Sequence, residues 1–176
     1  MNVAGLMLDA FGRIHRFVHD VVDDAPVEQL VFRFDGEANS IAWLTWHLTR
    51  IQDDHIAHVA GTDQVWAADG WAQRFDLPFA IGATGYGQSS EEAASVEVGP
   101  ELLTAYHDAV YEQTVRFVGH LTDVELDRIV DENWDPPVTL GVRLVSVIAD
   151  DLQHVGQAAY VLGLAQRSDT SSGLAP

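Results

Sequence analysis

The sequence predicts an all-α protein built on four long helices. Four segments carry apolar residues at helical spacing, and stretches with turn-forming glycine and proline separate them. The chain has 176 residues, of which 47% are hydrophobic and none is cysteine, so it can bury one sizeable core without disulfides. We therefore expect a single domain over residues 1–167 and a flexible tail at 168–176, which is rich in serine, glycine and proline.

The first expected helix covers residues 2–23 and presents one apolar stripe. His15 and His19 lie four residues apart on its polar side, beside arginines, and we interpret them as an ordinary exposed pair rather than as metal ligands. Residues 24–38 are expected to form a connector with at most one helical turn.

The second expected helix covers residues 41–60, with Asn39 or Ser40 as its N-cap and Gly61 as its C-cap. At about 100° per residue, His47 falls on the same face as the apolar core positions. A lone histidine on such a face is usually a hydrogen-bonded core residue. His47 therefore needs a partner elsewhere in the chain before it can be interpreted as a ligand.

A long connection, rich in aromatic residues, follows at residues 62–100. Loops of this length are usually lids, binding loops or disordered segments, and large aromatic side chains favour burial over disorder. We expect one or two short helices over residues 63–75, and a segment that forms a structural cap or the wall of a pocket. The aromatic residues are Trp66, Trp71, Phe75, Phe79 and Tyr86.

The third expected helix covers residues 101–121. Thr122 and Glu125 have the form of a capping box, which predicts a short helix through Val130. The fourth helix is then expected from about residue 139 to residue 166.

This fourth helix contains the pair of residues that indicates a function. Asp150 and His154 are four residues apart, so they project from one helix face and can converge on a single ion. His47 would complete a set of two imidazoles and one carboxylate, which suits Zn²⁺ first, with Ni²⁺ and Fe²⁺ as alternatives, and leaves a coordination position open. The sequence leaves open whether Asp150 or the adjacent Asp151 is the carboxylate ligand.

Further residues are expected to line the pocket or to support the ligands, and rival interpretations use some of them. Asp54 and His58 could instead form a structural ion pair. Arg143 could neutralise the adjacent carboxylates in place of a metal, because two carboxylates on an apolar helix face need a cation. The full set of expected supporting residues is Trp43, Asp54, His58, Trp66, Arg143 and Asp151.

The composition argues against several kinds of partner. With 9 basic and 27 acidic residues the formal charge is −18, which leaves no basic surface for nucleic acid or for an anionic membrane. No apolar run is long enough to span a bilayer, and the first 25 residues are amphipathic, so we expect a cytoplasmic protein. Because there is no cysteine, thiol chemistry would need a thiol from a substrate or cofactor.

The order of these features resembles a known family. His47 within Trp-His-Leu-Thr, followed much later by Asp150, His154 and a Gly-Gln pair, is similar to the DinB/YfiT-like superfamily of metalloenzymes. Within it, the chain resembles the metal-binding domain of mycothiol-dependent maleylpyruvate isomerase. The resemblance implies a DinB-like four-helix bundle in up-down-down-up order, with the long crossover between the second and third helices. It also implies three metal ligands, although relatives usually have histidine or glutamate at the position of Asp150.

Together with the absence of cysteine, the resemblance implies a metal-dependent enzyme of thiol-transferase or isomerase-like type. Its metal would activate an external, mycothiol-like thiol toward a small electrophile held beneath the aromatic crossover. The alternatives are a hydrolase that uses the same open site, a noncatalytic, stress-related protein that binds a metal or small ligand, and a purely structural role for these residues. The expected partners are a small-molecule substrate, a thiol, and a second copy of the chain in a homodimer.

Overall fold

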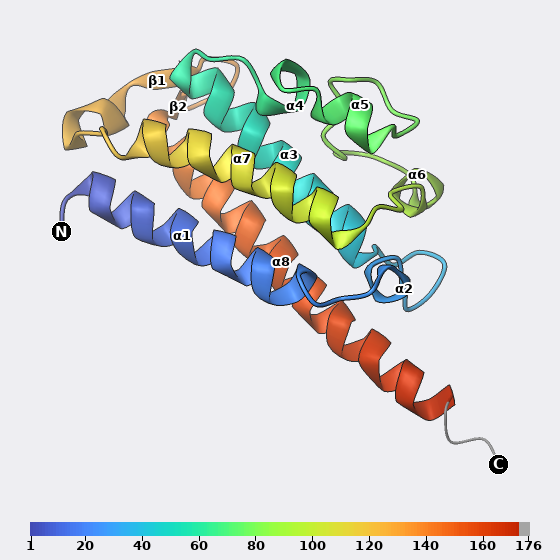
Figure 1. The fold of residues 1–176 in the computed structure, drawn as a ribbon. Helices are drawn as coiled ribbons and strands as arrows, with labels where there is room; N and C mark the ends of the chain where they lie inside the picture. Colours follow the sequence, from blue (N-terminus) through green and yellow to red (C-terminus); the bar gives the residue numbers. More distant parts are fainter. Residues whose placement is uncertain (173–176) are drawn as a thin grey trace.

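Four long helices form the body of the protein (Figure 1). The computed structural model describes residues 1–172, with side chains described through residue 168. Figure 1 shows α1 and α8 running in one direction, and α3 and α7 running in the opposite direction. Each long helix packs against two others: α3 against α8 and α7, and α1 against α7 and α8. The expected all-α class is confirmed, and the four helices are α1 (Val3–Val22), α3 (Ile41–Ala60), α7 (Pro100–Val118) and α8 (Leu140–Ser172).

The ends of α3 follow the capping signals in the sequence. The side chain of Ser40 accepts a hydrogen bond from the backbone N–H of Trp43, and Gly61 adopts the left-handed conformation with φ of 69°. Glycine adopts this conformation without a steric penalty, so the helix stops there. The capping residues therefore fix the ends of the helix that carries His47.

α8 is longer than the sequence pattern predicts. It continues to Ser172 instead of ending near residue 166, because no glycine or proline occurs between residue 166 and Gly173. Residues 168–172 of the expected tail are thus helical, and residues 173–176 lie outside the described part of the chain. At 33 residues α8 is about 50 Å long, and Figure 1 shows its C-terminal part extending beyond the bundle.

Short elements fill the connections. The helical turn expected within residues 24–38 and the two short helices expected over 63–75 are present. The short helix expected through Val130 ends at Asp127 instead, and α6 and a two-stranded β-hairpin were not predicted. The strands hold only three and two residues, too few for an alternating pattern to be recognised. These elements are α2 (Val27–Leu30), α4 (Val65–Ala68), α5 (Trp71–Phe75), α6 (Ser90–Ala94), the 3₁₀-helix η1 (Asp123–Asp127), β1 (Ile129–Asp131) and β2 (Val138–Thr139).

The core has two apolar parts with polar residues between them. Along α3, the apolar residues up to Leu48 belong to one part and those from Ile56 belong to the other. Buried polar side chains occupy the interval, where Gln52 donates a hydrogen bond to Thr114 over 2.7 Å. His107 of α7 is also fully buried.

The long crossover between α3 and α7 begins at a buried carboxylate. Both oxygens of Asp53 accept backbone hydrogen bonds, from the N–H groups of Val65 and Trp66 at the start of α4, over 2.9 and 2.8 Å. Asp53 also accepts a hydrogen bond from the hydroxyl of Tyr106 in α7, and it pairs with Arg50 at 3.4 Å. This single side chain therefore joins α3, α4 and α7. In the described residues, no helix is both long enough and apolar enough to cross a membrane.

Replacing Asp53 by alanine is expected to lower the free energy of unfolding by about 3–5 kcal/mol, because Arg50 would remain buried without its carboxylate. The adjacent residue supplies the matched control. Asp54 is partly exposed and makes one side-chain hydrogen bond, to Gln64, so Asp54→Ala should cost less than about 1 kcal/mol. Urea unfolding of both variants checks the difference, and equal losses would contradict the role assigned to Asp53.

Candidate metal centre

The helix α3 and the crossover together fix the imidazole of His47. The side chain is 6% exposed, and its Nδ1–H donates a hydrogen bond to the carbonyl of Thr84 over 2.6 Å. The indole of Trp43, one turn earlier, stacks on the ring with centroids 4.7 Å apart and planes at 12°. Because a carbonyl oxygen can only accept, Nδ1 carries the proton and Nε2 keeps its lone pair.

The histidine of α8 is prepared in the same way. His154 donates from Nδ1 to the side-chain carbonyl oxygen of Gln157, over 2.9 Å. Its Nε2 then carries the lone pair and lies 3.6 Å from Oδ1 of Asp150. Outer hydrogen bonds of this type hold metal-ligating histidines in the correct tautomer and orientation. Both histidines therefore have a donor atom prepared for an ion.

The three predicted ligands meet between α3 and α8. One donor atom from each of His47, Asp150 and His154 lies within 4.8 Å of the other two, and the two imidazole centroids are 4.7 Å apart. Ligand atoms around a tetrahedral Zn²⁺ are about 3.3 Å apart, given metal–ligand bonds of about 2.0 Å. The other oxygen of Asp150, Oδ2, is buried and has no hydrogen-bond partner among the described residues. The donor set and this unpaired oxygen both fit a divalent cation.

The charges of the three ligands are coupled. Burial lowers the pKa of His47, so this ring is neutral at pH 7. The contact with Asp150 raises the pKa of His154. Burial favours the neutral form of Asp150, but the contacts with His154 outweigh it and hold the pKa of Asp150 below its ordinary value. Both shifts show that Asp150 favours a positive charge at Nε2 of His154.

The crossover covers the site through close backbone contact. Gly85 has φ of 96°, and a Cβ atom placed there would lie 2.6 Å from Nδ1 of His47. Only glycine allows the chain to pass this close. Two further hydrogen bonds hold the same loop on α3: the indole N–H of Trp43 donates to Gln88 over 2.7 Å, and Arg50 donates to the carbonyl of Ala83 over 3.1 Å.

Two of the expected supporting residues lie elsewhere. Arg143 does not neutralise the carboxylates of α8: it pairs with Asp131 at 2.9 Å, since the β-hairpin brings Asp131 over the start of α8. Asp151 faces the core, fully buried, and neither of its oxygens has a hydrogen-bond partner among the described residues. Burial raises the pKa of Asp151 well above its ordinary value. Asp150, not Asp151, lies with the two histidines.

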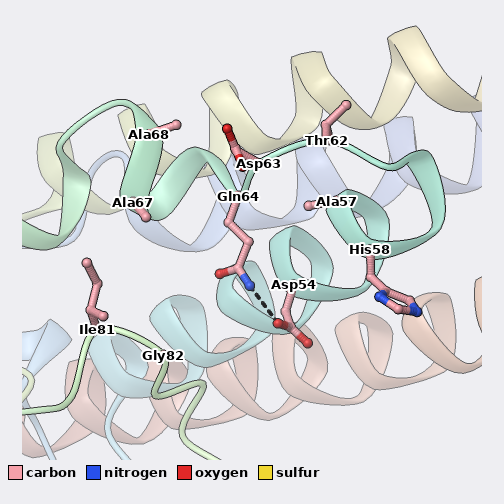
Figure 2. Close-up of a pocket in the computed structure, with 10 residues that line it drawn as sticks. All are labelled: Asp54, Ala57, His58, Thr62, Asp63, Gln64, Ala67, Ala68, Ile81 and Gly82. Atoms are coloured by element: carbon pink, nitrogen blue, oxygen red, sulfur yellow. Dashed lines mark hydrogen bonds between the residues drawn. The ribbon is translucent and has the colours of Figure 1, made fainter.

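Asp54 and His58 line a pocket of about 620 Å³ beside α4 (Figure 2). They do not form the ion pair considered above. Asp54 accepts a hydrogen bond from Gln64, which Figure 2 shows across the pocket, and Nε2 of His58 lies 3.3 Å from the carbonyl oxygen of Val130. Ile81 and Gly82, which precede the loop over His47, form part of the same wall.

Most of the aromatic residues of the crossover pack into the core. Trp66 makes edge-on or tilted ring contacts with Trp46, Phe75 and Tyr106, with centroids 5.1–6.2 Å apart, and it has no ring contact with His47 or His154 among the described residues. Tyr86, by contrast, is 91% exposed. The segment thus serves as a structural cap through its first half and as a cover for His47 through residues 83–88.

One residue near the ligands was not identified from the sequence. His55 lies one turn from Ile51 at the side of the ligand face, so the helical projection gave it no role. In the structure, Nη1 of Arg143 lies 3.5 Å from both ring nitrogens of His55. The carboxylate of Asp150 is close enough to His55 to favour its protonated form. Burial and Arg143 together lower the pKa of His55.

Comparison with known proteins gives matches to a family model and to solved structures. The family model described as the DinB superfamily matches residues 11–158. The crystal structure of the conserved protein of locus from Enterococcus faecalis has a TM-score of 0.87 and 31% sequence identity, over 94% of this chain and 98% of that chain. No curated protein matches the sequence. The homodimer, mycothiol and the likeness to the isomerase domain stay predictions.

The adjacent carboxylates of α8 provide a matched pair of variants. Asp150→Asn should lose most of the bound Zn²⁺, because it replaces a charged ligand by a neutral amide, whereas Asp151→Asn should retain it. Asp151 has a folded-state pKa above its unfolded value, so it lowers stability as the pH rises above about 4, and Asp151→Asn should be more stable than the wild type at pH 7. Elemental analysis and thermal unfolding measure the two effects. Retention of metal by Asp150→Asn with loss in Asp151→Asn would reverse the assignment.

Bound metal is expected to make the stability depend on pH. The pKa of His154 is raised above its ordinary value of about 6.5, so protons begin to compete with the metal for Nε2 of His154 at a pH above about 6.5. The pKa of His47 is lowered, so His47 stays neutral to a lower pH. The increase in melting temperature caused by Zn²⁺ should therefore be largest near pH 8 and shrink as the pH falls below 7. Melting curves with and without chelator from pH 5 to pH 8 check this. If chelator does not change the melting temperature at pH 8, the protein has no site that binds a metal tightly.

Proposed function

Because the chain belongs to the DinB superfamily, we propose that His47, Asp150 and His154 hold a divalent metal that activates an external thiol toward a small electrophile. The single observation that carries the proposal is the state of the donor atoms. Each imidazole has its Nδ1–H committed to a carbonyl oxygen, and one oxygen of Asp150 is buried without a partner. Such an arrangement is what a cation with an open coordination position requires.

The chemistry available to the protein supports an external nucleophile. When bound, a divalent cation lowers the pKa of a thiol or water that coordinates it and so supplies a nucleophile at neutral pH. The chain has no cysteine, so the sulfur would come from a low-molecular-weight thiol such as a mycothiol-like compound. Asp150 and His154 retain partial exposure, which leaves access to the open position.

The surrounding residues have separate tasks in this proposal. The loop over residues 83–88 excludes water from the side of His47 and keeps its ring in place. His55 is neutral at pH 7, because burial and Arg143 hold its pKa below the ordinary value, so it adds no positive charge that would compete with a cation for Asp150.

Thiol consumption tests this function. Metal-loaded wild-type protein should consume a low-molecular-weight thiol in the presence of a suitable electrophile, at a rate that falls at least about 100-fold in His47→Ala, since a ligand is lost. His120 is exposed and distant in sequence from every ligand, so His120→Ala serves as the matched control and should keep the wild-type rate.

The other outcomes separate the rival functions. Product formation without thiol consumption would indicate hydrolysis at the same site and contradict the thiol step. Stoichiometric metal with no turnover across several thiols, cations and electrophiles would indicate a noncatalytic binding protein. Absence of metal in protein purified without chelator, and no uptake of Zn²⁺ afterwards, would leave only the structural interpretation.

A further inference from the structure

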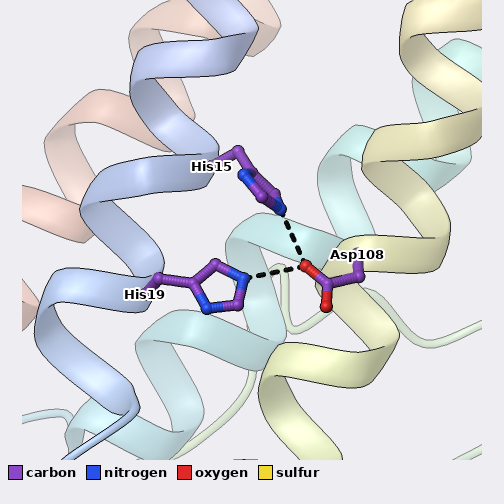
Figure 3. A group of neighbouring side chains, drawn as sticks. All are labelled: His15, His19 and Asp108. Atoms are coloured by element: carbon purple, nitrogen blue, oxygen red, sulfur yellow. Dashed lines mark hydrogen bonds and ion pairs between the residues drawn. The ribbon is translucent and has the colours of Figure 1, made fainter.

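A second group of potential ligands lies between the other two helices of the bundle. His15 and His19 of α1 and Asp108 of α7 point toward one another in Figure 3. Nε2 of His15 and Nε2 of His19 lie 2.7 and 2.8 Å from the same oxygen, Oδ1 of Asp108. The interpretation of His15 and His19 as an ordinary exposed pair is therefore wrong: their side chains are 28% and 27% exposed and face α7.

We propose that His15, His19 and Asp108 form a second site for a divalent metal, which joins α1 to α7. The ligand atoms would be Nε2 of both histidines and Oδ1 of the aspartate, which all lie within 4.8 Å of one another. The donor set, two imidazoles and one carboxylate, suits Zn²⁺ and related borderline cations. The proposal does not depend on any activity of the site at His47.

The construction repeats that of the first site. In both, one helix supplies two ligands four residues apart, and the helix packed against it supplies the third. Residues four apart on a helix lie on one face, about one turn from each other, so both side chains can reach one ion. Asp150 and His154 have this relation in α8, and His15 and His19 have it in α1.

The outer contacts of the two histidines favour ligation. Nδ1 of His19 faces the carboxylate of Asp23, at 2.9 and 3.0 Å from its two oxygens. A carboxylate on the outer nitrogen directs Nε2 to the metal and increases its basicity. The ring of His15 is held by stacking on Tyr111, with centroids 4.1 Å apart and planes at 21°. Both rings are thus oriented before an ion binds.

A small movement would admit the ion. Ligand atoms about Zn²⁺ are about 3.3 Å apart, so Asp108 would move away from the two nitrogens by about half an ångström. Its side chain is 46% exposed, and the movement meets no packed core. Three protein ligands and partial exposure leave at least one coordination position for water. The ion would act as a link between α1 and α7.

Zinc binding to the full-length chain, stripped of metal and without an affinity tag, tests the proposal. Equilibrium dialysis with elemental analysis should give two Zn²⁺ per wild-type chain, and one per chain in His19→Ala, in Asp108→Asn and in His47→Ala. The double variant His19→Ala with His47→Ala should bind none. Asp108→Asn removes only the charge of a partly exposed side chain, so this variant should fold and can still test the site if His19→Ala folds poorly. His120→Ala is the matched control and should bind two.

A more selective variant addresses the outer contact. Asp23→Asn keeps all three ligands, and it should weaken the second site about 10- to 100-fold, leaving the first unchanged. In the His47→Ala background, Zn²⁺ should raise the melting temperature, and the additional Asp108→Asn change should abolish the increase.

This set of variants can exclude the second site and the proposed function separately. If His19→Ala and Asp108→Asn bind as much Zn²⁺ as the wild type, or if His47→Ala alone removes all of it, the second site is excluded and the cluster is a hydrogen-bonded one only. If His47→Ala leaves the stoichiometry unchanged while His19→Ala abolishes binding, the second site stands and the proposed function falls.

Discussion

The hydrogen bonds that hold the long crossover against α3 are the constraint on which the rest of the structure depends. Because α3 and α7 run in the same direction, the chain between them must return along the bundle (Figure 1). Four residues of α3, each about one turn from the next, hold this return: Trp43, His47, Arg50 and Asp53. One of these bonds also fixes the tautomer of His47. The interaction that closes the fold is thus also the interaction that prepares the ligand.

Local patterns in the sequence account for the long helices and the first site. Helical periodicity predicts α3 almost to the residue, because Ser40 and Gly61 cap it through their own side-chain and backbone properties. Asp150 and His154 are related by helix geometry alone, and an imidazole on the buried face of α3 is a natural third partner. These inferences need only the pitch of a helix and the chemistry of the side chains.

The remaining features depend on how helices are rotated against one another, which a single sequence does not specify. Arg143 could reach Asp150 along its own helix, but the hairpin brings Asp131 closer. His15 and His19 look solvated until Asp108 of α7 is placed opposite them. His107 looks peripheral until α7 is turned toward α3, where its Nδ1 meets Thr49 at 3.1 Å. In each case the partner lies on another element, and no local pattern points to it.

The two candidate centres use separate pairs of helices, α3 with α8 and α1 with α7. No helix contributes a ligand to both, so mutations in one pair leave the ligand geometry of the other largely untouched. Over evolutionary time, a lineage could discard either centre and keep its counterpart. Among descendants of a common ancestor, the two sets of ligands would then be inherited as separate characters.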